Sequence, residues 1–535
     1  MSSAPLSSVA LFELVLLLLA IVIPLELVAR RLRLPPAAAQ ILAGMGLAFV
    51  PVEHRLQLDP DLILVLFLPP LLMSSAFFTV WRDFRTNISL IAALAVGAVI
   101  FTTAVVGVVA HLVMPSLPWA VCFALGAIVS PPDALAAKAV LQRVVLPPKL
   151  TVLLEGESLV NDASGLVLFR LAVAAALTGS FSVGDALTSF AVLSVGGIAM
   201  GLFIGWIATV LLARLHETPI LAVGTLLTAW ASYILADKLG FSGVLSTVAC
   251  GLVLGWRQHE LISAAARTSS QAVWRAVEFV LESLVFVLIG LSLRDVLFGQ
   301  EIEIERQWPA ILAVVAAVIL SRFVWMFSTS YGTNLLSGRW RAKPPVAVLV
   351  VMSWAGMRGV VSLAIALSLP ETLPGRDFIL LTTFVVILVT VLGQGSTLGP
   401  LIRAVRLPSN PAVSKNGLAG APMLSEIDAR LRVADAQLAT VQTLAYDEAG
   451  VLQHPRLLEQ YEYRQAVLRR VQASTEGMPG ARAAHFDVIV AAVAAGRAEL
   501  LRLHRSGEIH DSVLRSLESE LDLEELGARR RRGGD

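Results

Sequence analysis

Long apolar runs constrain the fold of this chain more than any other feature. A helix needs about 20 mostly apolar residues to cross the hydrocarbon core of a bilayer. Thirteen candidate runs lie between charged, proline or glycine breaks, over residues 8–29, 36–51, 61–80, 87–114, 118–138, 149–177, 187–213, 218–236, 241–256, 274–293, 308–332, 344–369 and 378–402. We therefore predict an all-α polytopic membrane protein with about 13 transmembrane helices.

The overall composition supports this class and excludes others. Hydrophobic residues make up 56% of the chain and charged residues 15%, whereas an average globular domain is about 45–50% apolar and about 25% charged. A soluble enzyme, a disordered scaffold and a collagen-like fibre are therefore excluded. The net charge of +1 gives no reason to expect a nucleic-acid partner. Cys122 and Cys250 lie in apolar runs and form no disulfide framework or metal site, and we expect no cofactor.

A change in charge density divides the chain in two. Charged residues are more than twice as frequent in residues 409–535 as in residues 1–408. We predict a transmembrane domain over 1–408 and a helical cytoplasmic tail over 409–535. Apolar residues at helical spacing begin after Ser425 and recur in 455–473, 480–504 and 507–527. This tail either regulates the protein or stabilises a dimer, or it is an inert appendage.

Basic residues in the connecting segments predict the orientation. Segments on one side of the predicted spans carry sixteen Arg and Lys residues, and those on the other side carry five. Because cytoplasmic segments are enriched in basic residues, we predict that the N-terminus lies outside the cell membrane and the tail inside. Thirteen spans then divide as six, one and six, which is the topology of an inverted repeat and is common among secondary transporters.

Two spans at matching positions of this repeat contain residues that interrupt a helix. In the fifth span, SPPDALAA at 130–137 contains two prolines, which cannot continue the helical hydrogen bonds, and Asp133. In the twelfth span, Gly356 and Gly359 flank Arg358. Unpaired backbone groups at membrane depth survive only where they line a cavity or an ion site. We predict two broken helices, with Arg358 balancing Asp133 or the helix-end charge; simple kinks are the alternative.

The sixth span carries a dense polar cluster, LEGESLVNDASG at 154–165. Asp162 lies thirteen residues beyond Lys149, which at ~1.5 Å per residue places it near the bilayer midplane. An ionisable residue at that depth indicates a function. Asp162 shares a helix face with Ser158, and Asn161 lies beside it. We predict that these oxygens and freed backbone carbonyls bind a monovalent cation; a polar network that only packs helices is the alternative.

Two further charges lie deep in predicted spans. Arg322 lies well inside the eleventh span, where an unpaired guanidinium is unfavourable by several kcal/mol. We predict an ion pair with Glu157, which leaves Asp162 as the acid that titrates. Glu282 lies well inside the tenth span and is a candidate auxiliary acid.

These motifs resemble those of the bacterial NhaP-type sodium/proton antiporters, relatives of the animal sodium/proton exchangers in the monovalent cation:proton antiporter superfamily. The resemblance covers most of residues 10–408 and rests on SPPDALAA at 130–137, GESLVNDA at 156–163, FVLIGLSL at 286–293 and GMRGVVSLAIALSLP at 356–370. It implies that spans 4–6 and 11–13 form a mobile core in which the broken spans 5 and 12 cross. The other spans would form an interface domain that makes a homodimer.

The resemblance also implies roles for individual residues. Asp162 is the ion-binding acid, Asn161 the amide before it and Ser158 an oxygen ligand, while Glu157 pairs with Arg322. An Asn-Asp pair, rather than Asp-Asp, goes with electroneutral exchange in this group.

The chain departs from the pattern of its relatives at three places. Many carry Thr-Asp-Pro where this chain has Pro-Asp-Ala at 132–134, so Pro132 offers only its carbonyl as a ligand. Some carry an acid after the Pro-Pro pair of the third span, where PPLLMSSA at 69–76 supplies only serines. Many carry Asn at the position of Glu282. We hypothesise that Glu282 compensates for the acid missing from the third span.

The expected function is exchange of Na⁺, or of Li⁺ or K⁺, for a proton, with both ions competing for Asp162. One-for-one exchange moves no net charge, and a titrating Glu282 would make it electrogenic. A K⁺/H⁺ or broad alkali-cation exchanger is an alternative, because oxygen ligands alone do not fix the ion. A sodium-coupled organic-anion symporter and a cation channel are less favoured. An intramembrane enzyme is disfavoured because the sequence has neither an HExxH motif nor a Ser/His pair at depth.

Overall fold

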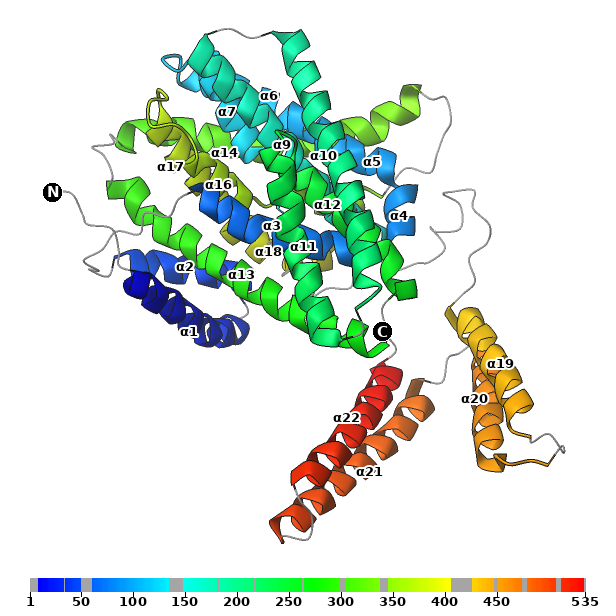
Figure 1. Cartoon of the computed structure of the whole chain (residues 1–535). Coiled ribbons are helices and arrows are strands. Elements are labelled where there is room, and N and C mark those ends of the chain that lie inside the picture. Colours follow the sequence, from blue (N-terminus) through cyan, green and yellow to red (C-terminus); the bar gives the residue numbers. More distant parts are fainter. Residues whose placement is uncertain are drawn as a thin grey trace. The chain divides into compact units, whose positions relative to one another are not determined.

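The computed structural model of the chain is predominantly helical in the part that it describes (Figure 1). The described residues are 8–32, 34–49, 60–133, 148–179, 182–215, 217–261, 264–298, 304–336, 345–405, 426–446, 451–473, 479–506 and 511–533. Within them there is no β-strand, and one isolated β-bridge joins Tyr446 to Leu452. The chain divides into two compact units, Met1–Gly417 and Leu418–Asp535. The predicted boundary at residue 408 lies outside the described residues.

The first unit contains the apolar helices, and every predicted run overlaps one of them. They are α1 (Ser8–Leu32), α2 (Pro36–Ala48), α3 (Pro60–Phe78), α4 (Trp81–Thr86), α5 (Ile88–Ala92), η1 (Ala93–Ala98), α6 (Val99–Val113), α7 (Trp119–Val129), α9 (Pro148–Thr178), α10 (Val183–Leu212), α11 (Thr218–Lys238), α12 (Gly243–Leu261), α13 (Ala264–Phe298), α14 (Ile304–Leu336), α15 (Val346–Trp354), α16 (Val360–Leu367), α17 (Arg376–Leu388), η2 (Val389–Gln394) and α18 (Gly395–Val405). Six helical segments among the described residues are long and apolar enough to cross a membrane. Shorter apolar helices include α2 and α7.

The structure differs from the sequence prediction in the length and continuity of some helices. α13 has 35 residues and α14 has 33, so both continue well beyond the predicted apolar runs. Hydropathy detects only the apolar part of a helix, whereas Arg, Gln and Glu at its ends are good helix formers. The runs 87–114 and 378–402 each contain a π-helical turn, η1 and η2.

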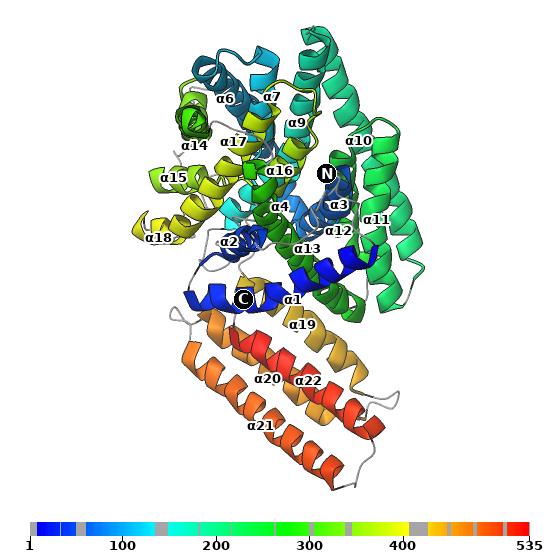
Figure 2. The same cartoon turned by 90° about the vertical axis from the view of Figure 1, so that its left-hand side faces the viewer.

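Glycines allow two pairs of helices in this unit to pack backbone to backbone. α2 and α13 lie side by side in both views (Figure 2). A Cβ added at Gly44 would overlap the α13 backbone, and one added at Gly290 would overlap the α2 backbone. Gly197 and Gly201 of α10 likewise lie against the backbone of Ser242 and Ser246 next to and within α12. Small residues at such contacts are typical of helix packing in membranes.

The second unit consists of two pairs of more polar helices. α19 (Glu426–Leu444) packs along α20 (Pro455–Ala473), and α21 (Pro479–Arg505) packs along α22 (Asp511–Gly533). Arg497 of α21 bridges Asp522 and Glu525 of α22 at 2.6 and 2.8 Å.

Candidate ion-binding site

The two segments predicted to interrupt helices lie against each other. α7 ends at Val129 and residues 130–133 are not helical; likewise α15 ends at Trp354 and the helix resumes at Val360 in α16. The amide of Asp133 donates a hydrogen bond to the carbonyl of Met357 at 2.7 Å. The N–H of Asp133 and the carbonyl of Met357, which lie outside the helices, therefore form a hydrogen bond with each other. The remainder of the predicted fifth span, residues 134–138, lies outside the described residues.

Close packing at this junction requires glycine. A Cβ at Gly359 would overlap the carboxylate of Asp133, and one at Gly356 would overlap the side chain of Arg322. Both glycines were singled out in the sequence as helix breakers. In the structure they also make room for charged groups, which a larger side chain would displace.

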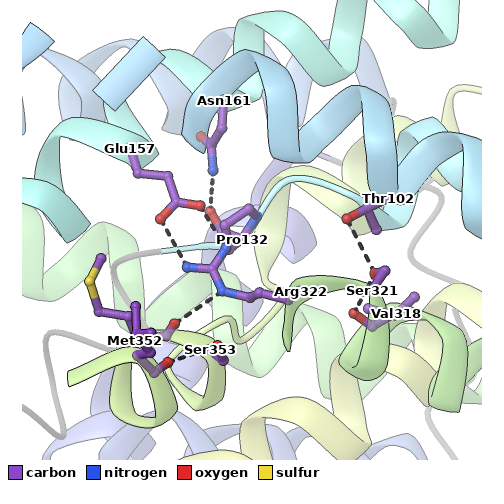
Figure 3. A network of polar contacts seen from close by, with 10 residues as sticks. Thr102, Pro132, Glu157, Asn161, Val318, Ser321, Arg322, Met352 and Ser353 are labelled. Carbon is purple, nitrogen blue, oxygen red and sulfur yellow. Dashed lines mark hydrogen bonds and ion pairs between the residues drawn. The ribbon is translucent and has the colours of Figure 1, made fainter. Parts of the chain in front are cut away.

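Helix α9 holds the first interrupted segment through Asn161 (Figure 3). The Asn161 side-chain amide donates to the carbonyl of Pro132 at 2.5 Å. Gly165, one turn further along α9, lies against the ring of Pro131. Asn161 is completely buried, and its Oδ1 accepts no hydrogen bond from the described residues. The amide thus fixes the carbonyl that sequence reasoning proposed as a ligand.

Glu157 and Arg322 form a bidentate ion pair (Figure 3). Nη1 and Nη2 of Arg322 donate to Oε1 and Oε2 of Glu157 at 2.6 and 2.9 Å. Nε donates to the carbonyl of Met352 at 3.1 Å, near the end of α15. The side chains are 1% and 4% exposed. The pair joins α9, α14 and α15, and each buried charge is compensated by the other.

Arg358 lies at the second interruption and is also buried. Its backbone N–H donates to the hydroxyl of Thr390 at 3.0 Å, and Thr390 belongs to the π-helical turn η2. In the part of the chain that the structure describes, Nε and Nη1 of Arg358 have no hydrogen-bond partner. The guanidinium therefore places a buried positive charge near the helix break.

A cavity of about 440 Å³ lies beside this junction, walled by α3, α9, α13 and α16. Asp162, Ser158 and Asp133 line it, and Asp162 is only 7% exposed. The residues of the predicted site that do not line it are Pro132, Glu157, Asn161, Arg322 and Arg358. The lining includes four carboxylates and one guanidinium, on Asp133, Glu155, Asp162, Glu278 and Arg275. A cleft with this excess of negative charge attracts cations.

The structure adds residues that sequence reasoning did not assign to the site. Glu278 of α13 lines the cavity, whereas Glu282, one turn further along, is half-buried and does not. The hydroxyl of Ser74 in α3 donates a hydrogen bond to Glu278. The sequence contained a weak signal for this residue, since Glu278 also lies inside a long helix of the membrane domain. Nothing in the sequence indicated that Ser74 would contact it.

Comparison with known proteins identifies the family of the chain and agrees with its fold. The sequence model of the family described as "Sodium/hydrogen exchanger, transmembrane" matches residues 16–404. An uncharacterized Na⁺/H⁺ exchanger of Mycobacterium tuberculosis is 34% identical over 533 residues, covering 95% of this chain and 94% of its own. A sodium, potassium, lithium and rubidium/H⁺ antiporter of Bacillus pumilus is 33% identical, covering 73% of this chain and 61% of its own.

The fold also matches a solved structure. The sodium proton antiporter MjNhaP1 of Methanocaldococcus jannaschii superimposes with a TM-score of 0.60 at 20% identity, covering 74% of this chain and 98% of its own. At that identity the likeness concerns the fold alone. The family match over residues 16–404 includes the Glu157–Arg322 pair and the cavity lined by Asp162. The chain therefore belongs to the transmembrane sodium/hydrogen exchanger family, whose members are multi-pass membrane transporters and not enzymes.

Proposed function

We propose that this protein exchanges one monovalent alkali cation for one proton across the cell membrane by alternating access. One observation carries the proposal: Asp162 is a nearly buried carboxylate that lines a negatively charged cavity beside two interrupted helices. Asp162 binds either a proton or a cation, assisted by Ser158, Asp133 and the carbonyl of Pro132. Only the forms of the protein with a proton or a cation bound to Asp162 change between the outward-facing and inward-facing conformations.

The coupling of the two fluxes follows from the cost of an uncompensated buried charge. An ionised carboxylate without a partner is strongly disfavoured in a medium of low polarity. When Asp162 is empty, the moving part of the protein would carry such a charge through the barrier. Binding of a proton or a cation neutralises the carboxylate of Asp162. The loaded protein therefore changes conformation faster than the protein with an empty site, and this difference couples the two fluxes.

The charges around the site support electroneutral exchange. Glu157 is compensated by Arg322, and Asp133 and Arg358 carry opposite charges at the two interruptions. Asp162 then contributes one negative charge, which one alkali cation or one proton balances equally. A cycle with the same net charge in both directions does not respond to membrane voltage.

We propose Na⁺ as the principal cation, with Li⁺ and K⁺ as further substrates. The family description names sodium, and a broader set is favoured by the relative from Bacillus pumilus, whose name includes potassium, lithium and rubidium. The orientation with an external N-terminus and a homodimeric assembly are part of the same proposal. Spans 4–6 and 11–13 would form the moving core, and residues 409–535 a cytoplasmic regulatory tail.

Reconstitution into proteoliposomes tests the proposal. Purified wild type and Asp162→Asn are compared in vesicles that trap a pH dye, while Na⁺, Li⁺, K⁺ or Rb⁺ is added outside. We expect cation-driven proton flux from wild type only, at the same rate with and without a potassium/valinomycin voltage clamp. Flux that persists in Asp162→Asn would contradict the assignment of the site. A rate that changes with voltage would contradict one-for-one exchange.

A further inference from the structure

The cavity contains a carboxylate that the proposed cycle does not use. Glu278 lies on α13 and lines the same cavity as Asp162 on α9. The hydroxyl of Ser74, which is completely buried in α3, donates a hydrogen bond to Glu278 Oε1. A side chain anchored in this way keeps one carboxylate oxygen at a fixed place in the wall.

The contact with α3 distinguishes Glu278 from its neighbour Glu282. The two acids are four residues apart, so they lie on the same side of α13, separated by about one helical turn of ~5.4 Å. Only Glu278 is level with Ser74 and lines the cavity. Comparing the two acids therefore tests the sequence hypothesis, which assigns the auxiliary role to Glu282, against the position of Glu278 at the cavity.

The nearby cation does not form a close ion pair with Glu278. Arg275 also lines the cavity, three residues before Glu278, but it is exposed and its Nε donates to the backbone carbonyl of Gln271 at 3.3 Å. Among the described residues, the ion pairs within 4.0 Å do not include Arg275 with Glu278. The carboxylate of Glu278 can therefore attract a cation in the cavity.

The size of the cavity indicates that a cation bound there keeps part of its hydration shell. A water molecule occupies about 30 Å³ in the liquid, so about 440 Å³ holds an alkali ion together with several of its waters. One carboxylate and one hydroxyl supply fewer oxygens than a hard cation takes when it is bare, which is about six. Waters must complete the shell at this position.

We propose that Glu278, positioned by Ser74, is a second cation-binding group, which holds a hydrated alkali ion in the cavity before the ion reaches Asp162. This inference rests on the proposed exchange function and adds a binding group to it. Because Glu278 acts before the ion reaches Asp162, it sets the apparent affinity for the cation rather than the maximal rate. Ser74 is a positioning residue that acts through Glu278.

The kinetic test compares Glu278→Gln, Ser74→Ala and Glu282→Gln in the proteoliposome assay. Loss of one charge about 4 Å from the ion in a watery cavity weakens binding about fivefold. We expect Glu278→Gln to raise the half-saturating Na⁺ concentration about fivefold with an unchanged maximal rate, and Glu282→Gln to match wild type. Ser74→Ala should shift the same concentration in the wild-type background but not in Glu278→Gln. Equal shifts in the two glutamine variants, or a lower maximal rate without a shift, would overturn the proposal.

A binding readout separates this inference from the exchange function. A ligand that binds only the folded protein raises its unfolding temperature according to its affinity. In detergent, Na⁺ should raise the unfolding temperature of Asp162→Asn slightly more than choline does. In the double variant Asp162→Asn/Glu278→Gln, the unfolding temperature should be the same in Na⁺ and in choline. If wild type moves no protons but Na⁺ stabilises Asp162→Asn more than the double variant, the proposed exchange function is wrong and Glu278 is still a cation-binding group. If wild type exchanges ions and the two variants are stabilised equally, Glu278 is not a binding group.

Discussion

The amide of Asp133 is hydrogen-bonded to the carbonyl of Met357 at 2.7 Å, so the non-helical segment after α7 and the one between α15 and α16 are joined through their backbones. Only proline at position 133 would remove this bond by substitution, because proline lacks the amide hydrogen. Other substitutions can disturb the bond through atoms placed beside it, and one such position is Gly359, whose added Cβ would overlap the carboxylate of Asp133. The junction is thus sensitive to substitution at a residue that has no side chain.

Gly359→Ala should abolish exchange in proteoliposomes, because the methyl group must displace Asp133 or separate the two interrupted segments. Gly46→Ala is the matched control, since a Cβ at this helical glycine in α2 meets no atom within 4 Å. It should exchange normally and be more stable by about 0.5–1 kcal/mol through its higher helix propensity. Full activity of Gly359→Ala would show that the two segments separate without loss of function.

Removing one partner of the Glu157–Arg322 pair should be more damaging than removing both. A buried charge left without its partner destabilises a protein by about 3–5 kcal/mol, whereas replacement of a whole buried pair is often neutral. Glu157→Gln and Arg322→Met should each lower the unfolding temperature in detergent, and the double variant should recover part of the loss. Additive losses in the double variant would mean that the two residues stabilise the fold independently.

Asn161→Ala should reduce the maximal rate of exchange, because the carbonyl of Pro132 loses its donor and the first interrupted segment loses its contact with α9. A buried carbonyl without a partner is unfavourable by about 1–3 kcal/mol. Ser164→Ala is the control, since among the described residues the hydroxyl of Ser164 bonds only to the carbonyl of Val160 in its own helix. Comparable losses in both variants would assign the effect to helix α9 as a whole.

The α21–α22 pair of the tail should loosen in acid. Hydrogen bonds from Arg497 and Arg529 lower the pKa of Glu525 below its ordinary value of 4.5. A carboxylate with a lowered pKa stabilises the folded state above pH 4.5, and this contribution disappears as the pH falls through the lowered pKa. The side chains of Glu525 and Arg529 are 17% and 62% exposed, so water and salt screen the ion pair and the effect is small.

The distance between spin labels on α21 and α22 of the full chain measures this change. At neutral pH, Glu525→Gln should broaden the distance distribution as acid does in wild type, and the variant should respond less to further acidification. Glu520→Gln is the control, because Glu520 is exposed and makes no ion pair among the described residues. Identical pH responses in wild type and Glu525→Gln would contradict the assignment.

The helices and the polar centre of the membrane unit could be predicted because each follows from a local rule. Apolar runs predicted the helices, and Pro131 and Pro132 predicted an interruption because they lack the amide hydrogens that a helix needs. The partnership of Glu157 with Arg322 was predictable from the high free energy of an unpaired buried charge. Proposals for the roles of Asp162, Asn161 and Ser158 came from depth and resemblance, and the transport assays test them.

Features that depend on how separate helices meet could not be predicted. Glu278 and Glu282 are four residues apart and lie on nearly the same side of α13, so the sequence does not distinguish them. Ser74 of α3 contacts α13 at Glu278, and this contact between helices places Glu278 at the cavity. The contact of Gly359 with Asp133 joins residues more than two hundred positions apart in the sequence. The hydrogen bond from Arg358 to Thr390 depends on a π-helical turn, for which the sequence carries no recognised signal.

That π-helical turn, Val389–Gln394, limits how the chain can change in length. A π turn holds one residue more than an α turn, and each residue of an α-helix rotates the chain by about 100°. Deleting one residue within it would restore an ordinary α-helix without rotating α18, whereas deleting a residue from the neighbouring α-helix would rotate everything beyond it by that angle. The deletion within the turn would, however, remove the widened turn in which Thr390 accepts a hydrogen bond from the backbone of Arg358. Substitutions within the segment leave the extra residue in place. A chimaera or a designed relative must therefore keep the extra residue, even where it keeps none of the side chains.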